Sequence, residues 1–231
     1  MSSTSLQSRL RSNSFKTCQA PGCSSQRSGL RLWCRTHLRL SNAYGHPDAK
    51  PLQGSLWATQ RAEVSKLFAD QSTHPGLLQA NRWLSTLMTQ AAANERAFKG
   101  AEEIARLGRA GVKPEALLVE ACALHLWVTD TGHRWPTDLA ADFAMSRAVF
   151  ALAPRPRTAT KGVHGTWGRP TTTPQSYSAK AKRSALAYVG GHFRECLAPL
   201  MVTVASAVQA QRAVKVDPQA LQRLPFAIRM A

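Results

Sequence analysis

The chain has no apolar run long enough to cross a bilayer, and only five of its 231 residues are cysteines. The apolar stretch at 197–208 falls well short of the roughly 20 residues that a spanning helix needs, so we expect a buried helix there. The N-terminal residues lack the apolar centre of a secretory signal. An odd number of cysteines beside candidate metal ligands argues against a disulfide framework. We therefore expect a cytoplasmic protein with no membrane contact.

Acidic residues are missing from two long segments. The chain carries 30 Lys and Arg against 13 Asp and Glu, a net charge of +17. Residues 1–47 contain seven bases and residues 143–194 contain nine, and neither segment contains an acid. A surface that only has to be soluble mixes charges of both signs. The two acid-free segments therefore predict a polyanionic partner, for which nucleic acid is a commoner candidate than an anionic membrane.

Apolar residues recur at helical spacing through residues 54–153, and no segment shows the alternation of a strand. Pro75 and Pro114 suit the first turns of two of these helices. Gly190 and Gly191, inside a last long helix, would either hinge that helix or allow a neighbour to pack closely. The recurring apolar residues of the first two helices are Leu56, Val64, Leu67, Phe68, Leu77, Leu78, Leu84, Leu87 and Met88.

The expected fold is mainly α, with a small N-terminal zinc-binding module, a helical domain, a basic arm rich in proline and glycine, and a long C-terminal helix. The basic arm is predicted from four prolines, three glycines and no acid within 24 residues. The expected parts are a disordered basic tail (1–16), the zinc-binding module (17–53), the helical domain (54–153), the basic arm (154–177), and the C-terminal helix and tail (178–231).

Three cysteines and one histidine fall within twenty residues, at the spacing Cys18-x4-Cys23-x10-Cys34-x2-His37. Structural zinc requires four N or S ligands, and two close pairs separated by a loop supply them. Pro21-Gly22 inside the first gap predicts a tight turn that frees backbone amides to bond the thiolates. Four protein ligands leave no open position, so the zinc is expected to be structural. His46 is a more distant substitute ligand.

The residues of this stretch also form a longer pattern, C-x-x-P-G-C … G-L … C-x-x-H-x-R … Y-G-H-P … P-L, over residues 18–52. This pattern resembles the small zinc modules of phage and plasmid proteins, which often accompany HNH-type endonucleases and other DNA-binding proteins of mobile elements. The resemblance implies Cys18, Cys23, Cys34 and His37 as zinc ligands and Arg35 and Arg39 as contacts to the partner. The chain departs from the nuclease pattern, because it lacks the paired His and Asn signature and offers only a single His133.

The arm contains Gly168-Arg169-Pro170, a short extended motif of the kind that lies in an A·T-rich minor groove. Docking on phosphates without sequence preference is the more general expectation for such a basic segment. The predicted nucleic-acid contacts in the module and the arm are Arg31, Arg35, Arg39, Arg155, Arg157, Lys161 and Arg169.

No paired carboxylates, phosphate-binding loop or catalytic triad stands out, so the sequence favours a protein that is not an enzyme. Cys122 and His125 lie among apolar neighbours and are expected in the core. His192 and Cys196 are one helical turn apart, but two ligands do not complete a metal site. Residues 139–153 faintly resemble a helix-turn-helix without its turn glycine, so we expect an ordinary buried helix there.

The function that the sequence favours is that of a DNA-binding accessory protein of a bacterial or phage mobile element. It would dock on the phosphates of double-stranded DNA through a structural Zn²⁺ module and a basic arm. The helical domain would scaffold these surfaces or recruit a protein partner. Two alternatives stay open: a zinc-containing module for protein–protein interaction, and a degenerate relative of HNH-type nucleases or recombinases.

Overall fold

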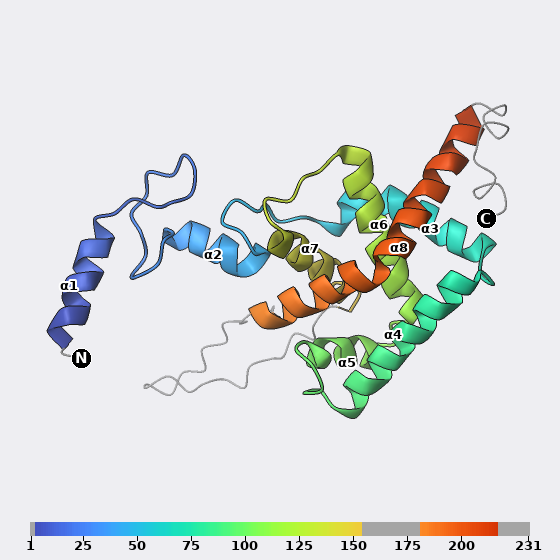
Figure 1. Cartoon of the computed structure of the whole chain (residues 1–231), viewed down its shortest axis with the longest axis horizontal. Helices are drawn as coiled ribbons and strands as arrows, with labels where there is room; N and C mark the ends of the chain where they lie inside the picture. The colour runs from blue at the N-terminus through green and yellow to red at the C-terminus, as the bar shows by residue number, and fades with distance from the viewer. Residues whose placement is uncertain (1–2, 154–180, 217–231) are drawn as a thin grey trace, which may run out of the picture.

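The structure is a computed structural model that describes residues 3–153 and 181–216 (Figure 1). Within these residues the chain forms eight α-helices and one short 3-10 helix, with no strand. This confirms the mainly α fold and the long C-terminal helix. In chain order the elements are α1 (Ser3–Ser14), α2 (Arg35–Tyr44), η1 (Gly54–Trp57), α3 (Ala58–Asp70), α4 (Pro75–Ala93), α5 (Ala101–Arg109), α6 (Pro114–Thr131), α7 (Asp138–Phe150) and α8 (Arg183–Val216).

The described residues form two regions. Helices α3 to α8 make up the helical body (residues 54–153 and 181–216), and the Cys/His module (residues 17–53) projects from it at the end of α2 (Figure 1). Helix α1 lies beyond the module, where the sequence predicted a disordered tail. Two properties favour this helix: its segment contains no glycine or proline, and Leu6 and Leu10 lie one turn apart.

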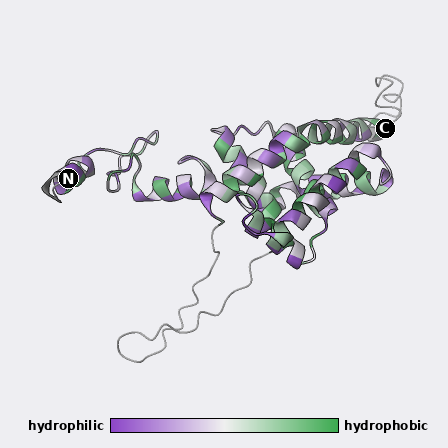
Figure 2. Cartoon of the chain, turned by 60° about the horizontal axis from the view of Figure 1, so that its bottom comes forward, coloured by the Kyte–Doolittle hydropathy of each residue, from purple (hydrophilic) through white to green (hydrophobic). Residues whose placement is uncertain are grey.

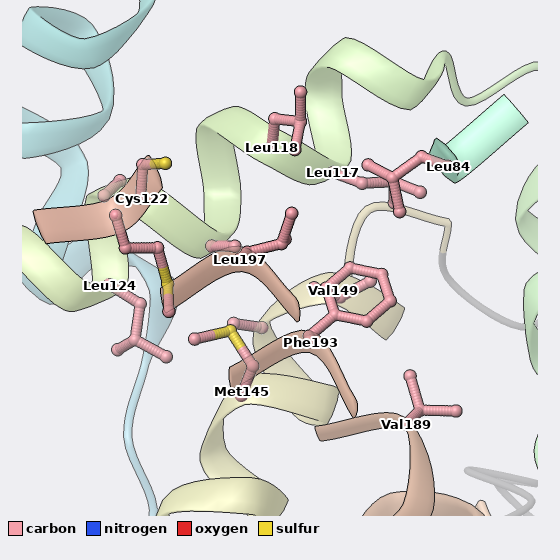
Figure 3. Packing of buried hydrophobic residues seen from close by; sticks show 14 of the residues in the cluster. Leu84, Leu117, Leu118, Cys122, Leu124, Met145, Val149, Val189, Phe193 and Leu197 are labelled. Atoms are coloured by element: carbon pink, nitrogen blue, oxygen red, sulfur yellow. The ribbon is translucent and has the colours of Figure 1, made fainter. Parts of the chain in front are cut away.

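Helix α8 crosses the helical body and makes its largest contact with α7 (Figure 1). Side chains from α4, α6, α7 and α8 converge on one continuous core (Figure 3). Leu84, Leu117, Val149 and Phe193, one from each of these helices, are fully buried. The apolar stretch at 197–208 lies within α8 and buries one face against this core, as expected.

Gly190 lets α7 and α8 approach each other closely. A Cβ atom at Gly190 would lie 1.8 Å from the backbone oxygen of Asp142, a separation that no side chain can adopt, whereas a Cβ at Gly191 would make only ordinary contacts. Helix α8 continues without interruption through Gly190 and Gly191. Nearby, the Ser146 hydroxyl donates to the backbone oxygen of Leu186 at 2.6 Å. Gly190 therefore serves close packing, the second of the two roles that the sequence left open.

Local sequence signals set several helix ends. Helices α4 and α6 begin at Pro75 and Pro114, as predicted, because proline has the backbone angle of a first helical turn and no amide hydrogen to leave unpaired. Thr137 caps α7 by accepting a hydrogen bond from the Ala140 amide at 3.2 Å. Two of the recurring leucines lie outside the core: Leu56 is 48% exposed and Leu78 is 42% exposed.

No helix in the described part of the chain combines the length and the apolar character needed to cross a membrane.

Candidate metal centre and basic surface

The structure brings Cys18, Cys23, Cys34 and His37 together, with one ligand atom from each within 4.8 Å of the others. The sulfur atoms of Cys18 and Cys34 each lie 3.4 Å from Nδ1 of His37, and those of Cys23 and Cys34 are 4.0 Å apart. Metal–ligand bonds of about 2.3 Å to sulfur and about 2.1 Å to nitrogen set tetrahedral edges of about 3.8 and about 3.6 Å. The cluster therefore has the dimensions of a Cys3His metal site.

A tight turn brings the first two ligands together. The Cys23 amide donates to the backbone oxygen of Ala20 at 3.1 Å, which closes a four-residue turn. Gly22 occupies its third position with φ +69°, and Pro21 precedes it. A type II turn requires positive φ at its third position and favours proline at its second. The turn predicted from Pro21-Gly22 is thus confirmed.

The N-terminus of α2 positions the second pair of ligands. Cys34 is the residue just before the helix, and His37 lies in the first turn, three residues later. This spacing puts the two side chains on one face of the helix. The backbone of His37 lowers the pKa of the Cys34 thiol, but burial and the side chains of Cys18 and Cys23 outweigh this effect, and the net pKa is raised. The positive partial charge at the helix N-terminus opposes that rise.

Cys18 is the thiol of the cluster whose pKa is lowered. Burial raises the pKa of this thiol, but hydrogen bonds from the backbone amides of Ala20 and Cys34 and from His37 outweigh burial and lower its pKa to about 6. The Cys34 amide lies 3.2 Å from the Cys18 sulfur. Because the thiolate is the form that binds metal ions, these contacts prepare Cys18 for coordination.

The module has almost no apolar core of its own. Its own apolar cluster consists of Cys18, Ala20 and Cys34, against which Cys23 and Trp33 pack. Backbone hydrogen bonds join its loops, among them Cys18 to Ser25 at 2.8 Å and Ser28 to Trp33 at 2.9 Å. So small a core stabilises a fold only weakly, and a coordinated metal would supply most of the missing stability.

His46 does not join the cluster. Its Nδ1 atom instead accepts a hydrogen bond from the Asp48 amide at 3.2 Å. The alternative ligand set considered from the sequence is therefore not assembled in the structure.

Three arginines predicted as nucleic-acid contacts are exposed on the module: Arg31, Arg35 and Arg39. Their guanidinium groups make no hydrogen bond or ion pair within the described residues. Arg35 and Arg39 also line a shallow cavity of about 270 Å³ along one face of α2. Figure 2 shows hydrophilic and hydrophobic residues mixed along α2 and along the helices of the body. The other four predicted contacts, Arg155, Arg157, Lys161 and Arg169, lie outside the described residues.

Most arginines that form ion pairs in the structure belong to the helical body, where carboxylates are available. Arg61 donates to Glu120 at 2.6 Å, and Arg212 binds both Glu63 and Asp130. Further pairs join Arg106 to Glu103, Arg109 to Glu95, and Arg194 to Asp138 and Asp142. The module arginines lack such partners because residues 1–47 contain no acid.

The C-terminal end of α2 is attached to the body. Gly45 follows the helix with φ +81°, and a Cβ there would lie 2.6 Å from the Leu139 backbone oxygen. Arg147 of α7 donates from Nε to the Ala43 backbone oxygen at 2.8 Å. Arg183 of α8 donates to the Asn42 side chain at 3.1 Å. The first turn of α8 is therefore held beside α2.

The other candidate sites from the sequence are not assembled into reactive groups. Cys122 is fully buried, and burial raises its pKa to about 12, which suits a core residue and not a nucleophile. His192 and Cys196 approach to 3.7 Å between Nδ1 and Sγ on α8, but no third ligand joins them in the part of the chain that the structure describes.

Two further candidates from the sequence, the segment at 139–153 and His133, also have roles in packing. Helix α7 is buried along much of its length, as expected for an ordinary core helix and not for a helix that docks in a DNA groove. His133 packs between the rings of Trp127 and Trp135, at centroid distances of 5.1 and 4.5 Å. In the described structure His133 belongs to no group of three or more candidate metal ligands.

A buried polar network was missed from the sequence. Glu120 is only 3% exposed, and its Oε1 accepts a hydrogen bond from the Trp57 indole at 2.7 Å. Arg61 donates to both oxygens of the same carboxylate. One signal was present: Glu120 is the only charged residue in the apolar run LLVEACALHLWV at 117–128. A buried carboxylate requires partners of this kind.

Comparison of the chain with protein-family models, with curated proteins and with solved structures gives no match. Its function must therefore be argued from its own residues. Those residues provide a Cys3His cluster able to hold a metal ion, at the base of a helix whose arginines have no carboxylate partner among the described residues.

Proposed function

We propose that the protein binds double-stranded DNA, using one structural zinc ion to hold a basic helix against the phosphate backbone. The observation that supports this most directly is the contrast in arginine pairing. Arg31, Arg35 and Arg39 are exposed and lack carboxylate partners in the described structure, whereas five arginines of the body pair with Asp or Glu: Arg61, Arg106, Arg109, Arg194 and Arg212. Exposed cations without internal partners suit a polyanion.

Zinc is the metal that we propose for the cluster. Three thiolates and one imidazole form a soft donor set, and a compact tetrahedral arrangement of such donors selects zinc over magnesium or calcium. With four protein ligands the coordination sphere is full, so the ion would stabilise the fold and leave no position for a reacting water.

Helix α2 would present the docking surface. Arg35 and Arg39 are one turn apart on this helix, so their side chains lie on the same face about 6 Å apart along its axis. The metal ligands hold the helix at one end, and its contacts with α7 and α8 hold the other. Cations on a fixed helix lose less entropy on binding than cations on a loose chain.

The predicted arm extends the proposal. Its basic residues, which lie outside the described part of the chain, would add phosphate contacts: Arg155, Arg157, Lys161 and Arg169. The accessory role in a bacterial or phage mobile element rests on the resemblance of residues 18–52 to zinc modules of such proteins.

Salt-dependent titration of a labelled DNA duplex tests the proposal. Docking on phosphates releases counterions, so we expect a slope of log K against log salt of roughly −3 to −6. Joint replacement Arg35→Glu and Arg39→Glu should flatten this slope by about two, whereas the control Arg109→Glu in the body should not. Deletion of residues 155–170 should flatten it by about two to four.

Unchanged affinity between low and physiological salt would favour the alternative of a protein-interaction module. Metal-dependent nicking of supercoiled plasmid that disappears on replacing His133 or His37 would favour a nuclease relative. Either result would replace the present proposal.

A further inference from the structure

A cavity of about 450 Å³ lies where the Cys/His module joins the helical body. Tyr44 at the end of α2 lines one side, Trp57 and Trp135 line others, and α7 contributes Ala144 and Arg147. This volume falls within the range of about 300–1,000 Å³ typical of small-molecule sites. None of its lining residues belongs to the metal cluster or to the proposed DNA-contact set.

The sequence of α7 explains why this space is not filled. Ala140, Ala144 and Ala148 recur every four residues and so face the cavity together. Small side chains on this face leave a gap between α7 and the aromatic rings of Trp57 and Trp135. The walls are consequently mostly apolar.

The charged residues that line the cavity leave an excess of positive charge. Glu120 and Arg61 both line it, but they satisfy each other, because Arg61 donates to both oxygens of the carboxylate. The indole of Trp57 donates a further hydrogen bond to the Glu120 carboxylate. The remaining charged lining residues, Lys50 and Arg147, are both cations.

Arg147 is the half-buried cation of the site. Its Nε donates to the Ala43 backbone oxygen at 2.8 Å, and its guanidinium carbon lies 4.7 Å from the Tyr44 ring centre. Its terminal Nη atoms have no hydrogen-bond or ion-pair partner among the described residues. Burial lowers the pKa of Arg147, which reflects the cost of keeping its charge away from water. An anion at the Nη atoms would offset that cost.

We propose that this cavity binds a small carboxylate with an apolar tail. The carboxylate pairs with the Nη donors of Arg147, since guanidinium and carboxylate match in a two-point geometry. The apolar tail lies against the alanine face of α7 and the rings of Trp57 and Trp135. Lys50 at the exposed edge adds attraction for the anion.

Such a ligand would act at the junction of the two regions. Arg147 also contacts Ala43 and Tyr44, the last residues of α2, so ligand binding would stiffen the attachment of α2 to the body. The binding itself needs neither DNA nor the module arginines, and its test is independent of the proposed function.

The test is a titration of the full-length, metal-loaded protein with octanoate, 1-naphthylacetate, 1-octanol and octylammonium. Calorimetry and intrinsic tryptophan fluorescence both report binding, because Trp57 and Trp135 line the cavity. We expect at least one of the carboxylates to bind once per chain, and octanoate to bind about tenfold or more tightly than octanol, as a charge-assisted pair predicts. Octylammonium should bind least.

Two variants locate the site. Ala144→Phe fills the cavity and should abolish carboxylate binding, whereas Ala92→Phe, at an exposed alanine of α4, should not. Arg147→Gln should weaken octanoate binding about tenfold and leave octanol binding unchanged. Arg134→Gln, at an exposed arginine outside the cavity, is its matched control. Circular dichroism confirms that each variant is folded.

Three results would overturn the proposal: absence of binding by both carboxylates, octanol binding as tightly as octanoate, or undiminished octanoate binding by Ala144→Phe. If Arg147→Gln does not fold, the ligand series on the wild type and the Ala144→Phe variant decide the question.

Discussion

The Cys/His module and the helical body depend on different sources of stability. The body buries large side chains such as Phe193, Leu84 and Leu117 in one continuous core. The module's own apolar cluster consists of Cys18, Ala20 and Cys34, and the first and last of these are candidate metal ligands. Apolar burial can therefore support the body, whereas the module requires another source of folding energy.

The two regions also differ in how they use arginine. In the body, Arg61 and Arg212 hold carboxylates from other helices and so tie the helices together. In the module, Arg27 is the structural arginine: its Nε donates to the Thr17 backbone oxygen at 2.8 Å. Arg35 and Arg39 have no such internal role within the described structure. Their exposure is compatible with the proposed contact to DNA.

Helix α2 connects the module to the helical body. Its first turn carries His37, and its last residues, Ala43 and Tyr44, contact Arg147 of the body. Damage at the metal cluster should therefore reach Arg35 and Arg39 while leaving the core of the body intact.

The largest expected effect follows from removing a metal ligand. Cys23→Ser should reduce the metal content from about one zinc per chain and unfold residues 17–53, since zinc supplies about 10–16 kcal/mol to comparable modules. Elemental analysis and hydrogen exchange measure the two effects. Cys196→Ser, at an exposed cysteine of α8, is the control and should retain both metal and fold.

Protein that is purified without chelator and contains no metal would contradict the assignment. So would unchanged exchange protection of residues 17–53 after chelation. In either case the module would fold on its turns and hydrogen bonds alone, and the contrast between the two regions would disappear.

Shortening a buried side chain of the body should reduce its stability without changing the metal content. Phe193→Ala should lower the free energy of unfolding of the body by about 3–5 kcal/mol, because it removes a buried ring and leaves a cavity. Denaturant unfolding measures this loss, and the metal content should not change. Val202→Ala, at a 55% exposed position on the same helix, should stay within about 0.5 kcal/mol of the wild type.

Replacing arginine by lysine tests the different uses of arginine in the body and in the module. Arg61→Lys should destabilise the body by about 1–3 kcal/mol, because lysine cannot donate in two-point geometry to the buried Glu120. Arg35→Lys with Arg39→Lys should leave the salt dependence of DNA binding almost unchanged, since counterion release depends on charge. A large loss of binding in the second variant would mean that α2 recognises bases and not phosphates.

Sequence patterns predicted the parts of this fold that depend on local chemistry. The ligand spacing, the Pro21-Gly22 turn, and the helix starts at Pro75 and Pro114 involve residues only a few positions apart. Helix periodicity also predicted that Val64 and Leu67 are buried.

Contacts between distant segments were not predictable in the same way. The pairing of Trp57 and Arg61 with Glu120 joins residues about sixty positions apart, and only the packing of α3 on α6 brings them together. The fit of Gly190 against Asp142 likewise depends on how α7 and α8 meet. Leu56 and Leu78 have helical spacing but lie outside the core, because spacing alone does not say which face a neighbour covers.

The smallest expected effect is a pH dependence within the body. The side chain of Asp130 is 17% exposed, and its partial burial raises its pKa, but hydrogen bonds from Gln60 and Arg212 outweigh this effect and the net pKa is lowered. A lowered folded-state pKa stabilises the protein above the ordinary aspartate pKa, and this contribution is lost as the pH falls through the folded value. Asp130→Asn should therefore cost about 0.2–1 kcal/mol at pH 7 and progressively less below about pH 4.

Denaturant unfolding of the wild type and Asp130→Asn over this pH range measures the difference, with Asp70→Asn, at an exposed site, as the control. A difference that persists undiminished at about pH 3 would mean that the side chain acts through packing and not through its charge. The metal content should be the same in all three proteins, because Asp130 is tied to Arg212 at the far end of α8 from the module. A change in metal content would show instead that the ion pairs of the body and the metal cluster are coupled through α2.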